Sequence, residues 1–325
     1  MYKSLVNQGD KPVFKWKGKD FLSIAEFSTD EILYLLDQAV EMKSLQKKGI
    51  PHPYLNGKIL GMIFEKSSTR TRVSFEVGMK QLGGDAIFLS FKDIQLGRGE
   101  TIEDTAKVLS RYVDGLMIRT FAHSTIETFA ANATVPVING LTDLHHPTQV
   151  MADLLTIFEH KGTLAGLKLC YIGDGNNNMC HSLLEGAAAV GMDITVASPQ
   201  GYEPNFKIIE QAKKTGQKTG SKVAFTLSPQ EAIEAADVVV TDVWTSMGQE
   251  NEQNERLNVF HPYQVNSELC SLADQDFIFL HCLPAHRGEE VTAEIIDGPH
   301  SVVFDEAENR LHAQKAILKA LMQTK

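Results

Sequence analysis

Residues 58–76 read KILGMIFEKSSTRTRVSFE, an apolar run that gives way to hydroxyl and arginine side chains. The continuous apolar run over residues 58–65 predicts a buried β-strand. Phe75, Met79 and Leu82 then fall at positions i, i+4 and i+7, a spacing that predicts an amphipathic α-helix. A buried strand that leads directly into a helix is the repeating unit of a parallel sheet with right-handed crossovers, so this stretch predicts an α/β fold.

The same unit repeats along the chain in two series. A capping box formed by Ser28 and Glu31 begins the first predicted helix, and amphipathic stretches predict further helices between the strands. We therefore expect two doubly wound parallel-sheet domains with helices on both faces, joined near residue 147. Apolar runs predict the remaining strands within residues 86–90, 115–120 and 135–140 in the first series, and within residues 167–175, 193–199, 222–227, 231–244 and 276–284 in the second.

The composition is that of a globular protein of about two domains, with 325 residues, 43% hydrophobic and 22% charged. The net charge of −10 argues against a nucleic-acid surface, which is usually a basic stripe. No apolar run approaches the roughly 20 residues that span a bilayer, and a polar N-terminal stretch broken by Pro12 argues against a secretory signal. Four scattered cysteines without a C-x-x-C pair indicate reduced thiols. We therefore expect a cytoplasmic protein that binds neither nucleic acid nor a membrane.

Ser68, Thr69, Arg70 and Thr71 lie where the strand of the opening stretch gives way to its helix. A helix N-terminus presents unpaired backbone N–H groups and the positive end of the helix dipole, both of which favour a phosphate. Arg70 can add a bidentate contact. The alternative is that Ser68 only caps the helix while Arg70 and Arg72 are solvated. These residues alone leave both interpretations open.

Further polar residues follow the predicted strands of the first series. Arg119 ends one strand, and His146 and Gln149 follow another at the start of a long helix. Because ligands of open parallel sheets bind beyond the carboxyl ends of the strands, we expect these residues at one sheet edge. Alone, such an arginine is as often a salt-bridge partner as an anion ligand, and a histidine before proline is more often a cap than a catalyst. Residues 93–104, DIQLGRGETIED, predict by themselves a surface loop.

In the second series, residues 171–183 (YIGDGNNNMCHSL) match the dinucleotide fingerprint G-x-G-x-x-G poorly, which argues against an NAD-dependent dehydrogenase. The asparagines suit the carboxylate or ammonium of an amino acid. Asp242, just past an apolar strand, is a natural partner for a substrate ammonium. Cys282 follows another strand, where its thiol could be a nucleophile, a metal ligand or part of a pocket wall. The sequence has no C-x-x-C pair and no spaced histidine pair, which disfavours a zinc site. The polar residues 245–264 are long enough to form a mobile loop over a site.

Together, four motifs make the chain resemble the carbamoyltransferase family over nearly its whole length. STRTR at Ser68 to Arg72 resembles the family's phosphate-binding signature, and HPTQ at His146 to Gln149 resembles its carbonyl-side partner. Both motifs are shared with aspartate carbamoyltransferases. DVWTSMG at Asp242 to Gly248 and HCLP at His281 to Pro284 resemble the ornithine branch of the family.

The resemblance implies a carbamoyl phosphate-binding domain at residues 1–147, with the C-terminal helix (about 306–325) packing back onto it, and an ornithine-binding domain at residues 148–305. The implied carbamoyl phosphate ligands are Ser68, Thr69, Arg70, Thr71, Gln95, Arg119, His146, Gln149, Cys282, Leu283 and Arg310. The implied ornithine ligands are Asn178, Asp242, Ser246 and Met247, and the implied catalytic residues are Arg70, Arg119, His146, Asp242 and Cys282.

Three of these assignments carry further implications. Gln95 would reach the site from an adjacent subunit, and Cys282 with Leu283 would close the space between the substrates. GDGNNN has one asparagine more than the family's common GDGNN, so the choice of Asn178 over Asn177 depends on anchoring the motif at Ser182.

The reaction that the resemblance implies is transfer of the carbamoyl group from carbamoyl phosphate to the δ-amine of L-ornithine. Arg70, Arg119 and His146 would stabilise the developing oxyanion, and Asp242 with Cys282 would favour the neutral amine. No metal or organic cofactor is required, and the family implies a homotrimer whose sites are shared between subunits. The alternatives are a carbamoyltransferase acting on putrescine, aspartate or an N-acylornithine, and a non-catalytic regulatory homologue, which the presence of every expected site residue disfavours.

Overall fold

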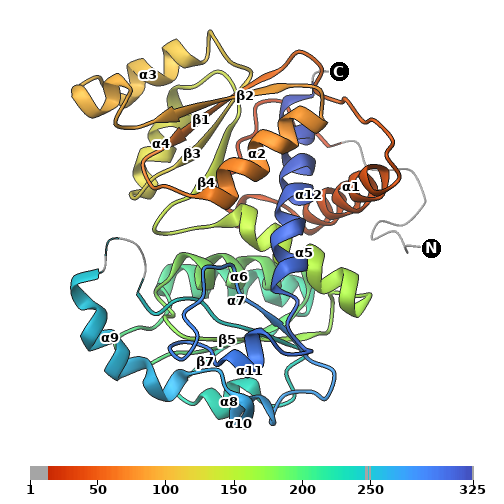
Figure 1. Cartoon of the computed structure of the whole chain (residues 1–325), viewed down its shortest axis with the longest axis vertical. Coiled ribbons are helices and arrows are strands. Elements are labelled where there is room, and N and C mark those ends of the chain that lie inside the picture. Colours follow the sequence, from red (N-terminus) through yellow and green to blue (C-terminus); the bar gives the residue numbers. More distant parts are fainter. Residues whose placement is uncertain (1–13, 246–247, 249, 324–325) are drawn as a thin grey trace. The chain divides into compact units, whose positions relative to one another are not determined.

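In the computed structural model the chain forms two compact units, one made of Met1–Leu155 and Glu308–Lys325, the other of Thr156–Ala307 (Figure 1). The structure describes residues 14–245, 248 and 250–323. Each unit contains one parallel β-sheet with its helices, which confirms the predicted α/β class. Among the helices of the described residues, none has the length and apolar character needed to cross a membrane.

The sheet of the first unit has four parallel strands in the order β2-β1-β3-β4. Strands β2 and β3 lie on opposite sides of β1, so the strand order reverses between β1 and β3. The sheet edge beyond the carboxyl ends of β1 and β3 is therefore the topological switch point, where α/β sheets bind ligands. The register pairs Phe64 at the end of β1 with Arg119 at the end of β3. The strands are β1 (Ile59–Phe64), β2 (Asp85–Ser90), β3 (Gly115–Arg119) and β4 (Val137–Leu141).

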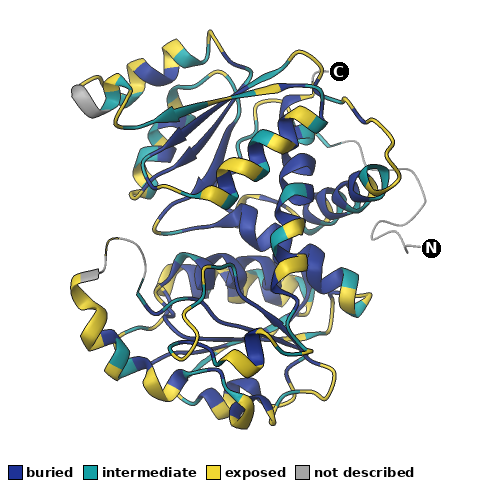
Figure 2. Ribbon diagram, in the orientation of Figure 1, coloured by how far each residue is buried: buried dark blue, intermediate teal, exposed yellow. Residues whose placement is uncertain are grey.

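Helices cover both faces of this sheet, whose strands β3 and β4 are buried throughout (Figure 2). Helices α3 and α4 pack on the face that carries Ile63 and Ile118. Side-chain directions alternate along a strand, so a Cβ atom built on Gly115 would point to the opposite face. On that face it would lie 3.0 Å from the Sδ atom of Met322 at the end of α12. The helices are η1 (Ile24–Glu26), α1 (Thr29–Lys47), α2 (Thr69–Gln81), η2 (Gln95–Arg98), α3 (Ile102–Leu109), α4 (His123–Asn132), α5 (Pro147–Lys161) and α12 (Val303–Met322).

The sheet of the second unit has five parallel strands in the order β7-β6-β5-β8-β9, with its switch point beyond β5 and β8. Its core brings Ile172, Val239 and Phe279 together with apolar residues of α8, α10 and α11. The strands are β5 (Lys168–Ile172), β6 (Asp193–Ala197), β7 (Val223–Thr226), β8 (Val238–Val240) and β9 (Ile278–Leu280). The helices are α6 (Asn178–Val190), α7 (Phe206–Thr219), α8 (Pro229–Ile233), η3 (Glu250–Glu252), α9 (Gln253–Phe260), η4 (His261–Tyr263), α10 (Ser267–Cys270) and α11 (Ala293–Ile296).

A strand is present in each of the nine predicted stretches. The prediction of a loop over residues 245–264 is wrong for most of that stretch, because α9 and two short 3-10 helices occupy it. Phe260 explains the difference: it is fully buried, with its ring 4.8 Å from that of Tyr202 and 5.9 Å from that of Trp244. Tyr263 and Arg256 of the same polar stretch are buried as well, so a few buried side chains fold it.

Candidate functional site

The first group of predicted site residues surrounds the N-terminus of α2, directly after β1. Ser68 is the N-cap, and its Oγ accepts a hydrogen bond from the backbone N–H of Thr71 at 3.2 Å. The Ser68 hydroxyl also lies 3.0 Å from Thr71 Oγ1, to which it donates. The capped helix points the positive end of its dipole toward the switch point of the sheet, where an anion is stabilised.

Arg310 reaches the same place from α12. Its Nη2 donates a hydrogen bond to Thr71 Oγ1 at 2.7 Å, across 239 positions of sequence. Both Thr71 and Arg310 are buried, whereas Thr69 beside them is exposed. The Thr71 hydroxyl thus links the start of α2 to the C-terminal helix.

His146 at the start of α5 and Arg119 at the end of β3 are buried in this unit. Burial first, and then the positive charges of Arg310, Arg119 and Arg70, hold the pKa of His146 well below its usual value. At pH 7 His146 is therefore a neutral imidazole, which can donate a hydrogen bond without adding charge. We call Ser68, Arg70, Thr71, Arg119, His146 and Arg310 the cationic cluster.

The other predicted residues of this unit differ in their surroundings. Gln149 is buried, and its Nε2 donates to Asp153 at 2.9 Å. Gln95 is exposed on η2, and its predicted role in a neighbouring subunit's site stays a prediction. Arg72 is engaged elsewhere, since its Nε pairs with Glu76 at 3.0 Å.

Two residues that the sequence analysis missed support the cationic cluster. The backbone N–H of Glu65 donates to the carbonyl of Arg119 at 2.8 Å, and its carboxylate accepts a hydrogen bond from the Thr120 hydroxyl. Lys66 forms an ion pair with Asp143, which lies in the loop before His146. Both residues directly follow β1, so the rule that drew attention to Ser68 could also have identified them.

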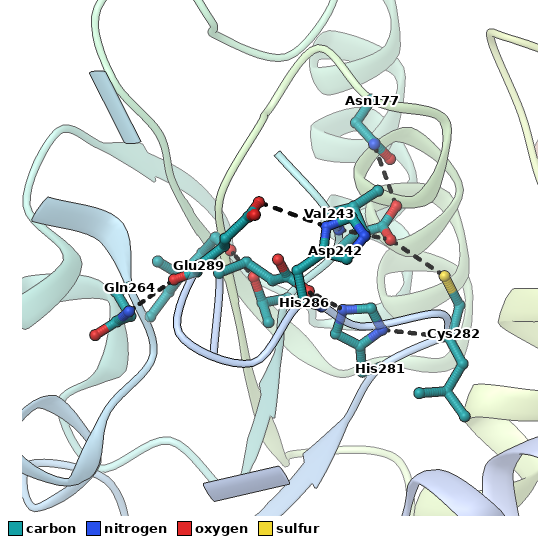
Figure 3. Close-up of polar contacts among 12 residues, drawn as sticks. Asn177, Asp242, Val243, Gln264, His281, Cys282, His286 and Glu289 are labelled. Atoms are coloured by element: carbon teal, nitrogen blue, oxygen red, sulfur yellow. Dashed lines mark hydrogen bonds and ion pairs between the residues drawn. The ribbon is translucent and has the colours of Figure 1, made fainter. Parts of the chain in front are cut away.

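In the second unit Asp242 follows β8 and joins three groups (Figure 3). Its Oδ2 accepts a hydrogen bond from Asn177 Nδ2 at 3.2 Å, and its Oδ1 accepts from the Cys282 thiol at 3.3 Å and from its neighbour's backbone N–H at 2.8 Å. Asp242 and Asn177 are buried and Cys282 is half-buried. We call these three residues the carboxylate cluster.

Asn177 is an asparagine of this turn that reaches Asp242. Asn177 is the N-cap of α6, and its Oδ1 accepts from the backbone N–H of Met179 at 2.6 Å, which turns the amide nitrogen toward the carboxylate. Asn178 is the first residue of α6 and is half-buried. The role of Asn178 as an ornithine ligand stays a prediction. Asparagine is a preferred N-cap residue, so the run of three asparagines at the start of α6 could have indicated that Asn177 caps the helix.

Arg256 of α9 was also missed. Its Nη1 pairs with Asp174 at 2.7 Å and donates to the carbonyl of Trp244 at 3.0 Å. Burial raises the pKa of Asp174, and the hydrogen bond and charge of Arg256 oppose that rise. Arg256 therefore ties the turn after β5 to the segment after β8. Ser246 and Met247 of that segment, two predicted ornithine ligands, lie outside the described residues.

Within the described part of the chain, two groups of side chains could offer ligands to a metal ion. Donor atoms of Asp242, His281 and Cys282 lie within 4.8 Å of one another, as do those of His286, Glu289 and Glu290. Both imidazole nitrogens of His281 already take part in hydrogen bonds, at 2.9 Å with the backbone N–H of Leu283 and at 3.1 Å with Glu290. A metal ion bound by His281 would have to replace one of them.

The two clusters have complementary chemistry. The cationic cluster combines a helix N-terminus, guanidinium groups and a neutral imidazole, which suits a phosphate and a developing oxyanion. The carboxylate cluster combines a carboxylate, an amide and a thiol, which suits an amine or ammonium group.

Comparison with protein families gives two matches that together cover nearly the whole chain. Residues 19–159 match the aspartate/ornithine carbamoyltransferase carbamoyl-P binding domain. Residues 165–321 match the aspartate/ornithine carbamoyltransferase Asp/Orn binding domain.

Individual proteins are similar over the same extent. An ornithine carbamoyltransferase of Carboxydothermus hydrogenoformans is 64% identical over 310 residues, 95% of this chain and 99% of that protein. One of Bacillus subtilis is 60% identical over 305 residues, 94% of each chain. The solved structure of ornithine carbamoyltransferase from Pyrococcus furiosus superimposes with a TM-score of 0.93 at 52% identity, covering 95% of this chain and 99% of that chain.

Proposed function

The chain belongs to the aspartate/ornithine carbamoyltransferase family, and we propose from this premise how it transfers the carbamoyl group of carbamoyl phosphate to the δ-amine of L-ornithine. The products are L-citrulline and phosphate. The observation that carries the reaction is the 64% identity, over 95% of the chain, to a relative named for it. The chain is accordingly an enzyme, a carbamoyl-group transferase that uses ornithine.

In this proposal the cationic cluster binds carbamoyl phosphate. The N–H groups at the start of α2, with Ser68, Thr69 and Thr71, hold the phosphate, and Arg70 adds a charge-assisted contact. Arg119 and the neutral His146 donate to the carbamoyl oxygen, where negative charge develops as the amine attacks. Support comes from the pKa of His146, which burial and then the charges of Arg310, Arg119 and Arg70 hold well below its usual value.

Further predicted ligands complete this half of the proposal. Gln149 would contact the carbamoyl group, Arg310 would reach the phosphate, and Cys282 with Leu283 would lie at the carbamoyl end. The buried hydrogen bond between Arg310 and Thr71 supports the placement of Arg310. We assign carbamoyl phosphate to residues 1–147 with 306–325, and ornithine to residues 148–305.

The carboxylate cluster binds ornithine in this proposal. Asp242 accepts hydrogen bonds from the substrate ammonium, and Asn178, Ser246 and Met247 are its further predicted ligands. The attacking amine must be neutral, and its removal from water beside the half-buried Cys282 would favour that form. The proton that the amine loses can leave with the phosphate. The hydrogen bonds that Asp242 makes with Asn177 and Cys282 support this assignment.

We propose that the protein is a homotrimer in the cytoplasm, serves arginine metabolism, and shares its sites between subunits through Gln95. Its four cysteines are free thiols. Exposed apolar side chains, which often mark an interface, lie on α2 (Val73 and Val77) and on β2 (Ile87).

Subunit complementation tests the shared site. A mixture of Gln95→Ala and Arg70→Gly proteins should regain activity after the subunits reassociate, and no recovery of activity would contradict a shared site.

The acceptor amine is tested with purified protein, carbamoyl phosphate and a panel of amines. We expect citrulline from ornithine and little product from putrescine, aspartate or N-acetylornithine. Good product from one of the other amines with none from ornithine would overturn the proposal. We expect this selectivity because a site built to pair a polar group of its acceptor amine rejects an analogue that lacks that group.

A further inference from the structure

We propose that His281 and Glu290 are positioning residues that hold Leu283, and through it the Cys282 thiol, in place against Asp242. The inference rests on the proposed function, because it concerns how the carboxylate cluster is kept in shape for ornithine. Neither His281 nor Glu290 belongs to that cluster, and the side chains of both are completely buried.

The hydrogen bonds of His281 define a single tautomer. Its Nδ1 lies 2.9 Å from the backbone nitrogen of Leu283, and a backbone N–H can only donate, so Nδ1 carries no proton. The ring proton is therefore on Nε2, which donates to Glu290 Oε1 at 3.1 Å. The same oxygen accepts the backbone N–H of His286 at 2.7 Å. Glu290 thus fixes the ring so that its other nitrogen faces Leu283, the arrangement by which a carboxylate orients a histidine.

Leu283 needs such support because its backbone is in the left-handed region, with φ of 57°. A leucine in that region carries steric strain that neighbouring contacts must hold in place. The hydrogen bond from its N–H to His281 is one such contact. The preceding strand end is held as well, since the backbone N–H of His281 donates to buried Glu306 at 2.9 Å.

Cys282 lies between these two fixed neighbours. Its Sγ is 3.3 Å from Asp242 Oδ1, and it is half-buried, whereas the other three cysteines of the chain are buried. Loss of the bond from Leu283 to His281 would let residue 283 leave its strained conformation. The thiol would then move away from the carboxylate without any change in the residues that touch ornithine.

Two substitutions at His281 separate this role from simple core packing. His281→Asn places an amide oxygen near the position of Nδ1 and can still accept from Leu283, whereas His281→Gln places its amide near Nε2. We expect KM for ornithine to rise about tenfold in His281→Gln, the size expected when a buried hydrogen bond is lost. KM for carbamoyl phosphate should rise as well, because Cys282 and Leu283 are predicted ligands of that substrate, and His281→Asn should stay close to the parent enzyme in both constants.

A second readout needs no turnover. Iodoacetamide alkylation of Cys282, followed by mass spectrometry, reports the position of the thiol in the free protein. We expect faster alkylation in His281→Gln than in the parent enzyme, and the parent rate in His281→Asn. A protein that made no citrulline would overturn the proposed function, yet this comparison would still decide the positioning role.

Glu290 provides an independent pair of variants. Glu290→Gln keeps an oxygen for both hydrogen bonds and should retain the parent alkylation rate, whereas Glu290→Leu should match His281→Gln. The adjacent Glu289→Gln is the matched control, because Glu289 pairs only with His286 at 3.5 Å near the surface. Equal alkylation rates in His281→Asn and His281→Gln, or in Glu290→Gln and Glu290→Leu, would overturn the proposal.

Discussion

The cationic cluster and the carboxylate cluster occupy equivalent places in their own sheets but are built differently. Each lies at a topological switch point, beyond β1 and β3 in the first unit and beyond β5 and β8 in the second. The cationic cluster takes its groups directly from a helix N-terminus and a strand end. In the second unit two buried pairs, His281 with Glu290 and Arg256 with Asp174, involve residues close in sequence to those of the carboxylate cluster.

The difference concerns how each unit manages buried polar groups. In the first unit the charges of three arginines act on buried His146, and its imidazole stays neutral and so adds no positive charge to theirs. In the second unit the buried Asp174 has its own counterion in Arg256. A cluster that binds an anion can rely on charge, whereas a cluster that must place an amine relies on fixed hydrogen bonds. The following experiments test that contrast.

The largest effect is expected at Arg70. Arg70→Gly should lower kcat/KM about a thousandfold while the protein stays folded, because a charge that stabilises the transition state is lost. Arg72→Gly is the matched control: it costs α2 about the same helix stability, ~1 kcal/mol, but removes an exposed pair with Glu76 and a cation–π contact with the Phe88 ring at 3.9 Å. Citrulline formation and circular dichroism provide the measurements, and near-normal turnover in Arg70→Gly would contradict the role of the cationic cluster.

The next effect concerns the carboxylate cluster. Asp242→Asn should raise KM for ornithine about a hundredfold, because the ammonium loses a charged partner, and should leave KM for carbamoyl phosphate nearly unchanged. Asp237→Asn is the control at the other end of β8, where the side chain only accepts the backbone N–H of Lys168 at 2.8 Å. If both Michaelis constants rose equally in Asp242→Asn, the division of substrates between the clusters would be wrong.

Thr71 should show a smaller, mixed effect. Thr71→Val keeps the shape of the side chain but removes the acceptor of the buried Arg310, so we expect a loss of about 1–3 kcal/mol in the free energy of unfolding. KM for carbamoyl phosphate should rise as well. Thr69→Val, at an exposed position, should affect binding without lowering stability. Thermal unfolding distinguishes the two, and equal melting temperatures would contradict the linking role of Thr71.

The smallest effect is a difference in acid stability between the units. Burial and nearby lysines lower the pKa of His312 in the first unit to about 3, and the pKa of His146 is also lowered. As the pH falls below 6.5, the unfolded chain binds protons that these folded imidazoles do not, so the free energy of unfolding decreases. In the second unit the raised pKa of Asp174 acts in the opposite sense, since folded Asp174 takes up a proton before the unfolded chain does.

The chain offers a reporter for each unit, because its two tryptophans are Trp16 and Trp244. In acid titrations of Trp244→Phe and Trp16→Phe proteins, the Trp16 fluorescence should change at a higher pH than the Trp244 fluorescence. His312→Leu should move the Trp16 transition to lower pH and leave the other in place. Coincident transitions that His312→Leu does not separate or shift would show that the units respond to acid as one.

Sequence patterns were sufficient for the architecture because the signals of strands and helices are local. Apolar runs of five to nine residues and periodic helices depend on neighbours a few positions away. The rule that parallel strands share a carboxyl edge then places Ser68, Arg119 and His146 near one another before any coordinate is known. α9 escaped this reasoning, because the burial of Phe260 and the long-range pairing of Arg256 with Asp174 outweigh a polar composition.

The sequence by itself determined the two α/β units, the strand ends that carry polar residues, and the resemblance to a family of carbamoyltransferases. Only the tertiary structure decided that Asn177 reaches Asp242 and that Arg256 pairs with Asp174. The physical reason is that a side chain's partner depends on where the chain returns after many residues, as between Thr71 and Arg310. Burial and neighbouring charge, which lower the pKa of His146, likewise arise only in the folded chain.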